Sequence, residues 1–230
     1  MKKSENSTLA SGLYVVATPI GNLEDITLRA IRVLNEVDVI AAEDTRNTGR
    51  LLKKLEIETP MLGYHDHNEK RFAPQLVERM LNGERIALVS DAGTPLISDP
   101  GYRLVNAAVE ANIYVTGIPG PCAAINALAT SGLAVHEFSF RGFLPKKSTQ
   151  MARALAAAVA EEGSTIFYES PHRLKKTLGI LLENHPEAKI CVGREMTKLF
   201  EENMRGTAAD ILKIIGERTV KGEITIIVEG

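Results

Sequence analysis

Short apolar runs rich in β-branched residues alternate with segments of helical length along almost the whole chain of 230 residues. This alternation constrains the fold most, because strands that are separated by helices pair in parallel and build layered α/β domains. We therefore predict an α/β protein with largely parallel sheets. The expected strands are residues 13–17, 37–42, 61–64, 85–90, 113–117, 137–141, 165–169, 188–193 and 223–229.

The segment from Gly117 to Pro121 reads Gly-Ile-Pro-Gly-Pro and is the best candidate for a domain boundary. Proline and glycine at this density continue neither a strand nor a helix. We predict an N-terminal α/β domain over residues 1–118 and a C-terminal α/β domain over residues 119–230. Residues 1–12 lack the apolar core of a signal peptide, so we expect them to form a loose tail.

The formal net charge of −2 gives the chain no overall basic bias of the kind that non-specific nucleic-acid binders carry. Residues 138–160 nevertheless contain four basic residues and no acidic one. This stretch is either a solvated loop and helix surface or a patch that contacts phosphates.

The only cysteines are Cys122 and Cys191, and neither belongs to a C-x-x-C motif. Without metal-ligand spacing we predict no metal site, and two isolated cysteines are typical of a reducing, cytoplasmic setting. The longest uncharged run, residues 111–135, is interrupted by the proline and glycine segment. We therefore predict no transmembrane helix.

Several common nucleotide-site and hydrolase motifs are absent from the sequence. There is no G-x-G-x-x-G, no G-x-x-x-x-G-K-[ST], no G-x-S-x-G and no H-E-x-x-H. Ordinary dinucleotide binding, P-loop phosphoryl transfer and two kinds of hydrolase therefore lose support.

Ligands of open α/β sheets bind at the carboxyl ends of the strands, so the loops after the expected strands are the candidate sites. The first loop, residues 17–25, contains Pro19 and leads to Thr27, which is a candidate helix cap. The second, residues 42–48, places Glu43, Asp44 and Arg46 at the end of an apolar strand. Each has a structural alternative: a tight turn in the first loop, and a helix cap by Asp44 or Thr45 in the second.

The third loop contains His65 and His67. A lone pair of histidines two residues apart is weak support for a metal site, and we favour general-base or substrate-positioning work, with an exposed polar loop as the alternative. The fourth loop, residues 90–101, gives the strongest signal. Two glycines and two prolines in twelve residues impose an irregular backbone, which lets main-chain groups approach a ligand closely.

The fifth loop leads into Cys122 and Ala123, where small residues begin a helix whose free N–H groups either meet a ligand or only pack on the sheet. In the second half, residues 167–173 and 192–198 each follow a strand with glutamate and arginine. These two segments are either site residues or structural ion pairs.

Nine motifs in order carry a resemblance to a known family: ATPIGNLEDIT, AAEDTRNTG, HDHNE, LVSDAGTPLISDPGY, IPGPCAA, GFLPKK, FYESPHR, GREMTK and KGEITIIVEG. The sequence resembles the tetrapyrrole methylase superfamily of S-adenosylmethionine-dependent methyltransferases, and within it the members that modify ribosomal RNA. The resemblance implies two α/β domains with the cofactor in the cleft between them, usually in a homodimer. It also implies methylation of the ribose 2′-hydroxyl of a cytidine in the decoding region of small-subunit (16S) rRNA.

The resemblance further implies which residues contact S-adenosylmethionine. In the first domain and at the hinge these are Pro19, Asp91, Ala92, Gly93, Thr94, Ile97, Pro121, Cys122 and Ala123, and in the second domain Tyr168 and Glu195. The resemblance also implies that many relatives continue past the position of Gly230, with an extension for which we expect a role in holding RNA.

A ribose hydroxyl becomes a good nucleophile only when a base accepts its proton. Our candidates for that base are the strand-end residues Glu43, Asp44, His65 and His67. The candidates for phosphate contacts are Arg46, Arg141, Lys146, Lys147 and Arg173, toward either free rRNA or the assembled small subunit.

Two other functions remain open from the sequence. One is a methyltransferase of the same superfamily that acts on a small tetrapyrrole-like acceptor, although a chain without tryptophan and with 5% aromatic residues is poorly suited to an apolar macrocycle. The other is a non-catalytic RNA-binding assembly factor that keeps the fold.

Overall fold

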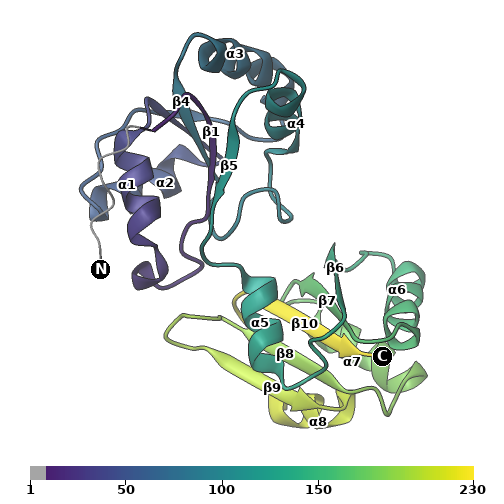
Figure 1. The fold of residues 1–230 in the computed structure, drawn as a ribbon. Coiled ribbons are helices and arrows are strands. Elements are labelled where there is room, and N and C mark those ends of the chain that lie inside the picture. Colours follow the sequence, from purple (N-terminus) through teal and green to yellow (C-terminus); the bar gives the residue numbers. More distant parts are fainter. Residues whose placement is uncertain (1–8) are drawn as a thin grey trace. The chain divides into compact units, whose positions relative to one another are not determined.

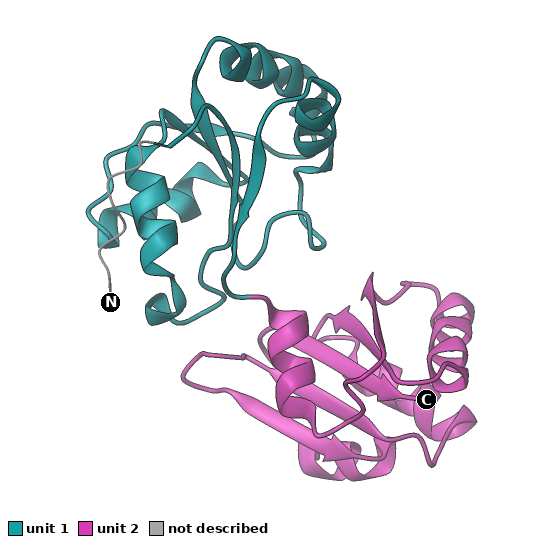
Figure 2. Ribbon diagram, viewed as in Figure 1, with its two compact units in different colours: residues 1–121 teal, residues 122–230 magenta. Residues whose placement is uncertain are grey.

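The computed structural model describes residues 9–230 and divides the chain into two compact units, residues 1–121 and 122–230 (Figure 2). The division follows Pro121, in the same proline and glycine segment in which the sequence predicts a boundary after residue 118. Residues 1–8 of the expected tail lie outside the described residues, whereas Gly12, also assigned to that tail, begins the first strand.

Unit 1 is built on a sheet of five parallel strands, as the alternation predicts. The strands are β1 (Gly12–Val16), β2 (Val39–Ala42), β3 (Met61–Gly63), β4 (Arg85–Val89) and β5 (Val115–Ile118), in the spatial order β3-β2-β4-β1-β5. Every neighbouring pair is parallel, so all five carboxyl ends lie along one edge of the sheet. This arrangement brings the loops after the strands together.

Helices cover both faces of this sheet (Figure 1). The 3-10 turn η1 (Leu23–Asp25) precedes α1 (Leu28–Glu36), which Thr27 caps as predicted by accepting a hydrogen bond from the Ala30 N–H. On one face α1 and α2 (Thr45–Lys54) pack Leu34 and Leu52 on the strands. On the other, α3 (Glu69–Leu81) and α4 (Tyr102–Glu110) pack Leu76 and Leu104. A parallel sheet needs such cover because its strands are apolar on both sides.

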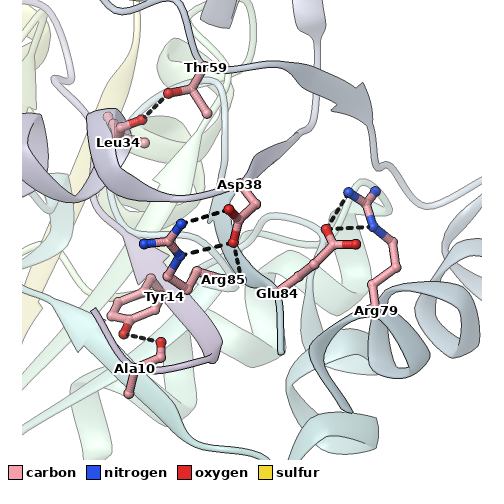
Figure 3. Close-up of polar contacts among 8 residues, drawn as sticks. All are labelled: Ala10, Tyr14, Leu34, Asp38, Thr59, Arg79, Glu84 and Arg85. Atoms are coloured by element: carbon pink, nitrogen blue, oxygen red, sulfur yellow. Dashed lines mark hydrogen bonds and ion pairs between the residues drawn. The ribbon is translucent and has the colours of Figure 1, made fainter. Parts of the chain in front are cut away.

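Charged pairs hold the amino end of the sheet, opposite the loops that follow the strands (Figure 3). Arg85, the first residue of β4, donates to Asp38 through its guanidinium and its main-chain N–H, each at 2.7 Å. These hydrogen bonds lower the pKa of Asp38 to about 2. Nearby, Arg79 donates to Glu84. The Arg85–Asp38 pair connects the starts of β4 and β2. The Arg79–Glu84 pair connects the end of α3 to the residue before β4.

Unit 2 contains a second five-stranded sheet with four helices. Its elements are α5 (Ala123–Ser131), β6 (Phe138–Phe143), α6 (Ser148–Ala160), β7 (Ser164–Glu169), α7 (Leu174–Asn184), β8 (Ile190–Arg194), β9 (Glu202–Gly206), α8 (Ala208–Ile215) and β10 (Ile224–Glu229). The strand order is β6-β7-β10-β8-β9, and only β6 and β7 are parallel. The expectation of largely parallel sheets is therefore wrong for unit 2.

The connections between its strands explain why the sheet of unit 2 is mixed. Residues 195–201 join β8 to β9 directly, without the crossover helix that a parallel pair requires. The last strand, β10, then enters antiparallel between β7 and β8. Helices α6, α7 and α8 bury one face of the sheet around Phe167 and Ile226, while α5 packs on the other face. None of the helices in residues 9–230 is long and apolar enough to cross a membrane.

Candidate active site

Hydrogen bonds connect three of the five loops at the carboxyl edge of the unit 1 sheet. Thr18, after β1, and Gly93, after β4, exchange two N–H to C=O hydrogen bonds of 2.9 and 3.0 Å. The Thr94 hydroxyl donates to the Pro121 carbonyl over 3.1 Å and so connects this pair to the segment after β5. The loops with Pro19, with residues 91–94 and with Pro121 therefore form one connected structure.

The loop after β4 has an unusual backbone along much of its length. Gly93 and Gly101 have φ angles of 82° and 132°, and the non-glycine residues Leu96 and Ser98 also have positive φ angles, of 73° and 71°. A Cβ atom on Gly93 would lie 3.2 Å from Ile20 Cγ2, and one on Gly101 only 2.7 Å from Leu88 Cδ2. Strained conformations of this kind persist where the surroundings hold them and are common at ligand sites. The backbone of this loop is therefore held in a conformation that allows a ligand to approach it closely.

Main-chain hydrogen bonds connect two carboxylates, Glu43 after β2 and Asp91 after β4. The Asp91 N–H donates to Glu43 Oε2, and the Asp44 N–H donates to Asp91 Oδ1, both over 3.2 Å. Asn47, from the first turn of α2, donates to Asp91 Oδ2 over 2.9 Å. Asp91 is therefore oriented by the residues that follow β2.

Two side chains in this region hold protons more tightly than ordinary carboxyl groups. Burial, and then the charge of Asp91, raises the pKa of Glu43, against the opposing effect of the hydrogen bond from the Asp91 N–H. Burial, and then the charge of Glu43, raises the pKa of Asp99 to about 6. A pair of carboxyl groups with raised pKa values beside an irregular loop is typical of an acid–base site. We call Glu43, Asp91 and Asp99 the carboxylate cluster.

Asp99, Asn47 and Ser90 are not among the residues predicted from the sequence. Asp99 lies within SDAGTPLISDPG, where its aspartate-proline pair resembles an ordinary turn. Its burial and its proximity to Glu43 depend on the packing of the loop, so no local signal identifies it. A hydrogen bond with Ser90 partly offsets the rise in its pKa.

Asp44 has a structural role, one of the two alternatives that the sequence leaves open for it. Its side chain caps α2 by accepting from the Arg46 N–H over 2.8 Å, and it pairs with the Arg46 guanidinium at 2.6 Å. The hydrogen bonds from Arg46 hold the pKa of Asp44 far below its usual range. An ionised, paired carboxylate is a weak proton acceptor, so Asp44 is a poorer base candidate than Glu43.

Asn68 holds His65 in one orientation at the end of β3. The His65 N–H donates to Asn68 Oδ1 and Asn68 Nδ2 donates to the Gly63 carbonyl, both over 2.9 Å, which fixes the amide orientation. His65 Nε2 lies 3.2 Å from the same Nδ2 and therefore accepts. The exposed His67 ring is edge-on to His65 with 5.9 Å between centroids. Over residues 9–230 no three His, Cys, Asp or Glu side chains form a group that could hold a metal ion.

The predicted cofactor residues of unit 2 lie at its strand ends and at the start of its first helix. Tyr168, in β7, contacts the rings of Phe140 and Phe143, and the partly buried Cys122 and Ala123 begin α5. Glu195 follows β8 with a positive φ of 50° and accepts from Lys198 Nζ at 2.8 Å and from the Glu223 N–H at 3.0 Å. The hydrogen bond from Lys198 lowers the pKa of Glu195.

The predicted phosphate contacts differ in how they are engaged. Lys146 and Lys147 are exposed, and in the described part of the chain neither has a carboxylate within ion-pair distance. Arg46 is exposed but paired with Asp44, and Arg141 is paired with Glu161.

Arg173 is the most constrained of these basic residues. It pairs with the fully buried carboxylate of Glu169 at 2.5 Å and donates to the carbonyls of Leu144 and Pro145. Glu169 also accepts from the Thr177 hydroxyl over 2.8 Å. Arg173 thus fixes the loop after β6 to the end of β7, which is a structural role.

Comparison with known proteins agrees with this geometry. Residues 12–212 match the family model of the Tetrapyrrole (Corrin/Porphyrin) Methylases. Ribosomal RNA small subunit methyltransferase I of Halalkalibacterium halodurans is 50% identical over 95% of this chain and 75% of its own length. The proteins of the same name from Streptococcus pyogenes serotype M1 and Bacillus subtilis are 46% and 45% identical, over 100% and 95% of this chain and 80% and 75% of their own.

Solved structures show the same fold at much lower identity. Uroporphyrin-III-C-methyltransferase from Thermus thermophilus superposes with a TM-score of 0.65 at 21% identity, covering 95% of this chain and 94% of that one. The methyltransferase CobJ gives a TM-score of 0.69 at 19% identity, covering 96% and 94%. From its family model, its relatives and its fold together, the chain belongs to the tetrapyrrole methylase family, and within it to the ribosomal RNA small subunit methyltransferase I group.

Proposed function

We propose that this protein transfers a methyl group from S-adenosylmethionine to the ribose 2′-hydroxyl of a cytidine in the decoding region of small-subunit rRNA. The observation that carries the proposal is the carboxylate cluster beside the prebuilt loop after β4, in a chain up to 50% identical to proteins named for rRNA methylation. The loop accounts for cofactor binding and the cluster for proton removal. These are the two tasks that 2′-O-methylation sets.

The loops of unit 1 fit S-adenosylmethionine by the close approach that they allow. The absence of a side chain at Gly93 lets its backbone lie close to Ile20, and Asp91, Ala92 and Ile97 beside it are exposed. We assign cofactor contacts to Pro19, Asp91, Ala92, Gly93, Thr94, Ile97, Pro121, Cys122 and Ala123, and to Tyr168 and Glu195 of unit 2. The bound cofactor supplies an electrophilic methyl group on its sulfonium.

The protein's own chemistry then consists of positioning and proton transfer. A 2′-oxygen held in line at near-attack distance gains most of its rate from that placement. Glu43 is our choice for the base, because its raised pKa brings it closer to the working pH while its Oε2 is fixed by the Asp91 N–H. The hydroxyl proton passes to the Glu43 carboxylate as the new oxygen–carbon bond forms.

The two histidines remain candidates for positioning the acceptor. His65 is held by Asn68, and its Nδ1 is buried with no hydrogen-bond partner among the described residues. A buried ring nitrogen of this kind is normally hydrogen-bonded, so a ligand group is a natural partner for it. His67, which is exposed, is the outer member of the pair.

Binding of RNA is assigned to the exposed cations, with Lys146 and Lys147 first and Arg46 and Arg141 second. A chain with a net charge of −2 cannot rely on non-specific attraction to RNA, so a shaped acceptor such as the assembled small subunit suits it better. The protein is proposed to act as a homodimer, as the sequence resemblance implies.

The direct test incubates the protein with S-adenosylmethionine carrying a labelled methyl group and small ribosomal subunits from cells that lack this gene. Nuclease digestion and mass spectrometry then locate the label. Label on a cytidine 2′-oxygen supports the proposal. Label only on a tetrapyrrole offered in parallel, or RNA binding without cofactor binding, would replace it with one of the two alternative functions.

A further inference from the structure

Three aromatic rings gather at one edge of the unit 2 sheet. The edge strand β6 carries Phe140 and Phe143, and both rings meet Tyr168 of β7 edge-on, with centroid distances of 5.0 and 5.6 Å. Phe143 is 61% exposed, and Phe138, at the start of the same strand, is 46% exposed. We call Phe138, Phe140 and Phe143 of β6 the aromatic cluster, and Tyr168, which is assigned to the cofactor, contacts two of its rings.

A β-bulge places these rings on one face. Phe140 and Phe143 are an odd number of residues apart and would point to opposite faces of a regular strand. The register shifts between them, so that Phe140 pairs with Ile166 and Phe143 with Tyr168. Gly142, with a φ of 63°, provides the left-handed conformation that such a bulge favours. The extra residue returns Phe143 to the face of Phe140.

That face is only partly covered within unit 2. Phe167 points into the core with α6, α7 and α8, so its neighbour Tyr168 points to the opposite face, where α5 packs. Helix α5 lies mainly against β10 and β8, which leaves the β6 edge open (Figure 1). Phe143 is mostly exposed there, and Phe138 is about half exposed.

Two exposed lysines follow the rings closely in the sequence. Lys146 and Lys147 follow β6 within four residues of Phe143 and are exposed, and no described carboxylate lies within ion-pair distance of either. Arg141 lies in the same strand, although Glu161 neutralises it. Proteins that hold single-stranded nucleic acid combine such features, because bases stack on aromatic rings while lysines meet the phosphates.

We propose that the aromatic cluster is a stacking platform for an unpaired nucleobase of the RNA substrate, with Phe143 as the principal contact and Lys146 and Lys147 on the flanking phosphates. This inference rests on the proposed function for its choice of RNA and adds a specific binding surface to it. It explains why an edge strand exposes phenylalanine. It also predicts that unpaired RNA binds better than duplex RNA.

The test uses the full chain and two fluorescent probes, a 12-nucleotide oligocytidylate and a blunt RNA duplex of the same length. Wild type is compared with Phe143→Ala, Phe143→Trp and the control Leu199→Ala, which removes an apolar side chain that is 90% exposed on the β8–β9 loop. Fluorescence anisotropy gives Kd at several salt concentrations. Loss of one stacked base is expected to weaken oligocytidylate binding about 5- to 100-fold, and a larger ring retains it.

Stacking has a signature that a charge effect lacks. Phe143→Ala is expected to lower affinity equally at each salt concentration, whereas removal of a lysine changes the salt dependence. We expect Leu199→Ala to bind oligocytidylate as tightly as wild type. We also expect Phe143→Ala to bind the duplex as tightly as wild type. Equal affinities of wild type and Phe143→Ala for oligocytidylate overturn the platform, as does a Phe143→Ala variant whose only change is in oligomeric state or melting temperature. Phe138→Ala provides a second variant at the same cluster.

The outcome separates this inference from the proposed function. If wild type methylates small subunits while Phe143→Ala binds the single strand normally, only the platform fails. If single-strand binding depends on Phe143 but no methyl transfer to small subunits occurs, the proposed reaction fails and the RNA surface remains.

Discussion

The Asp91 N–H donates to Glu43 Oε2 over 3.2 Å, and this hydrogen bond joins the ends of two adjacent parallel strands. Because β2 and β4 are neighbours in the sheet, residues far apart in the sequence meet at its carboxyl edge. The bond fixes one oxygen of Glu43 and connects the proposed base to a proposed cofactor residue. Loss of this hydrogen bond is therefore expected to affect both functions of the site, whereas Glu43→Gln keeps an oxygen that accepts it.

Replacement of Gly93 by alanine tests the prebuilt loop. The substitution forces a side chain onto a φ of 82° and 3.2 Å from Ile20, which disturbs the pairing with Thr18. We expect the calorimetric Kd for S-adenosylmethionine to rise by about tenfold or more, equivalent to about 1.4 kcal/mol.

Gly83→Ala is the matched control for Gly93→Ala. Gly83 has a φ of 98°, lies between α3 and β4, and has no heavy atom near a built Cβ. Both variants carry backbone strain of about 1–2 kcal/mol, so both melt at lower temperature, but only Gly93→Ala is expected to lose cofactor affinity. Equal affinities in the two variants would contradict a role for the loop.

The raised pKa of Asp99 predicts a specific pH dependence of stability. Its pKa of about 6 exceeds its usual 3.8, so the folded state binds a proton more tightly than the unfolded chain. The free energy of unfolding therefore falls as the pH rises from 3.8 to about 6. Asp99→Asn removes the penalty and should stabilise the protein at about pH 8 by up to about 2 kcal/mol, with no gain at about pH 4. Melting temperatures measured at both pH values decide this, and a gain only at low pH would refute it.

Arg173 is predicted to act on stability more than on RNA binding. Arg173→Met leaves the buried Glu169 carboxylate without its cation and is expected to destabilise unit 2 by about 3–5 kcal/mol. Adding Glu169→Gln should restore much of that loss in a denaturant titration. Lys146→Gln removes the same charge from an exposed position and should leave stability unchanged. If Arg173→Met were as stable as wild type, the structural role would be wrong and Arg173 would again be a candidate for phosphate contact.

Lys146 and Lys147, which have no ion-pair partner among residues 9–230, are expected to determine the salt dependence of RNA binding. Lys146→Gln and Lys147→Gln each remove one phosphate-binding charge, so each should reduce the slope of log K against log salt by about 1. Lys176→Gln, an exposed charge on α7, serves as the control. The measurement is a salt titration of small-subunit binding, and cofactor affinity should not change in any variant. Identical slopes in all three would assign the RNA surface elsewhere.

The sequence predicts unit 1 well because its inner strands β1, β2 and β4 are nearly continuous buried runs. All four residues of β2, Val39–Ala42, are buried, as an apolar run between turn signals implies. Parallel pairing then requires that the loops after the strands share one edge. The effect of the Glu43 charge on Asp99 lies beyond this reasoning, because it depends on how an irregular loop folds back on the sheet.

Unit 2 is less predictable because its pairings span long distances in the sequence. Strand β9 reads Glu-Asn-Met-Arg-Gly, without a β-branched residue, and packing of Met204 in the core and pairing with β8 hold it in place. The antiparallel entry of β10 likewise has no local signal. Arg173 shows the same limit, since a basic residue after a strand looks alike whether it meets a phosphate or a buried carboxylate.

The central claim is that the carboxylate cluster of unit 1 serves methyl transfer to rRNA, and single-turnover transfer by Glu43→Gln tests it most directly. Wild type, Glu43→Gln and the control Asp44→Ala are mixed with labelled S-adenosylmethionine and unmodified small subunits. We predict that Glu43→Gln binds the cofactor normally but transfers the methyl group about 10²- to 10⁴-fold more slowly, whereas Asp44→Ala keeps most of its rate. Wild-type rates in Glu43→Gln would contradict the account.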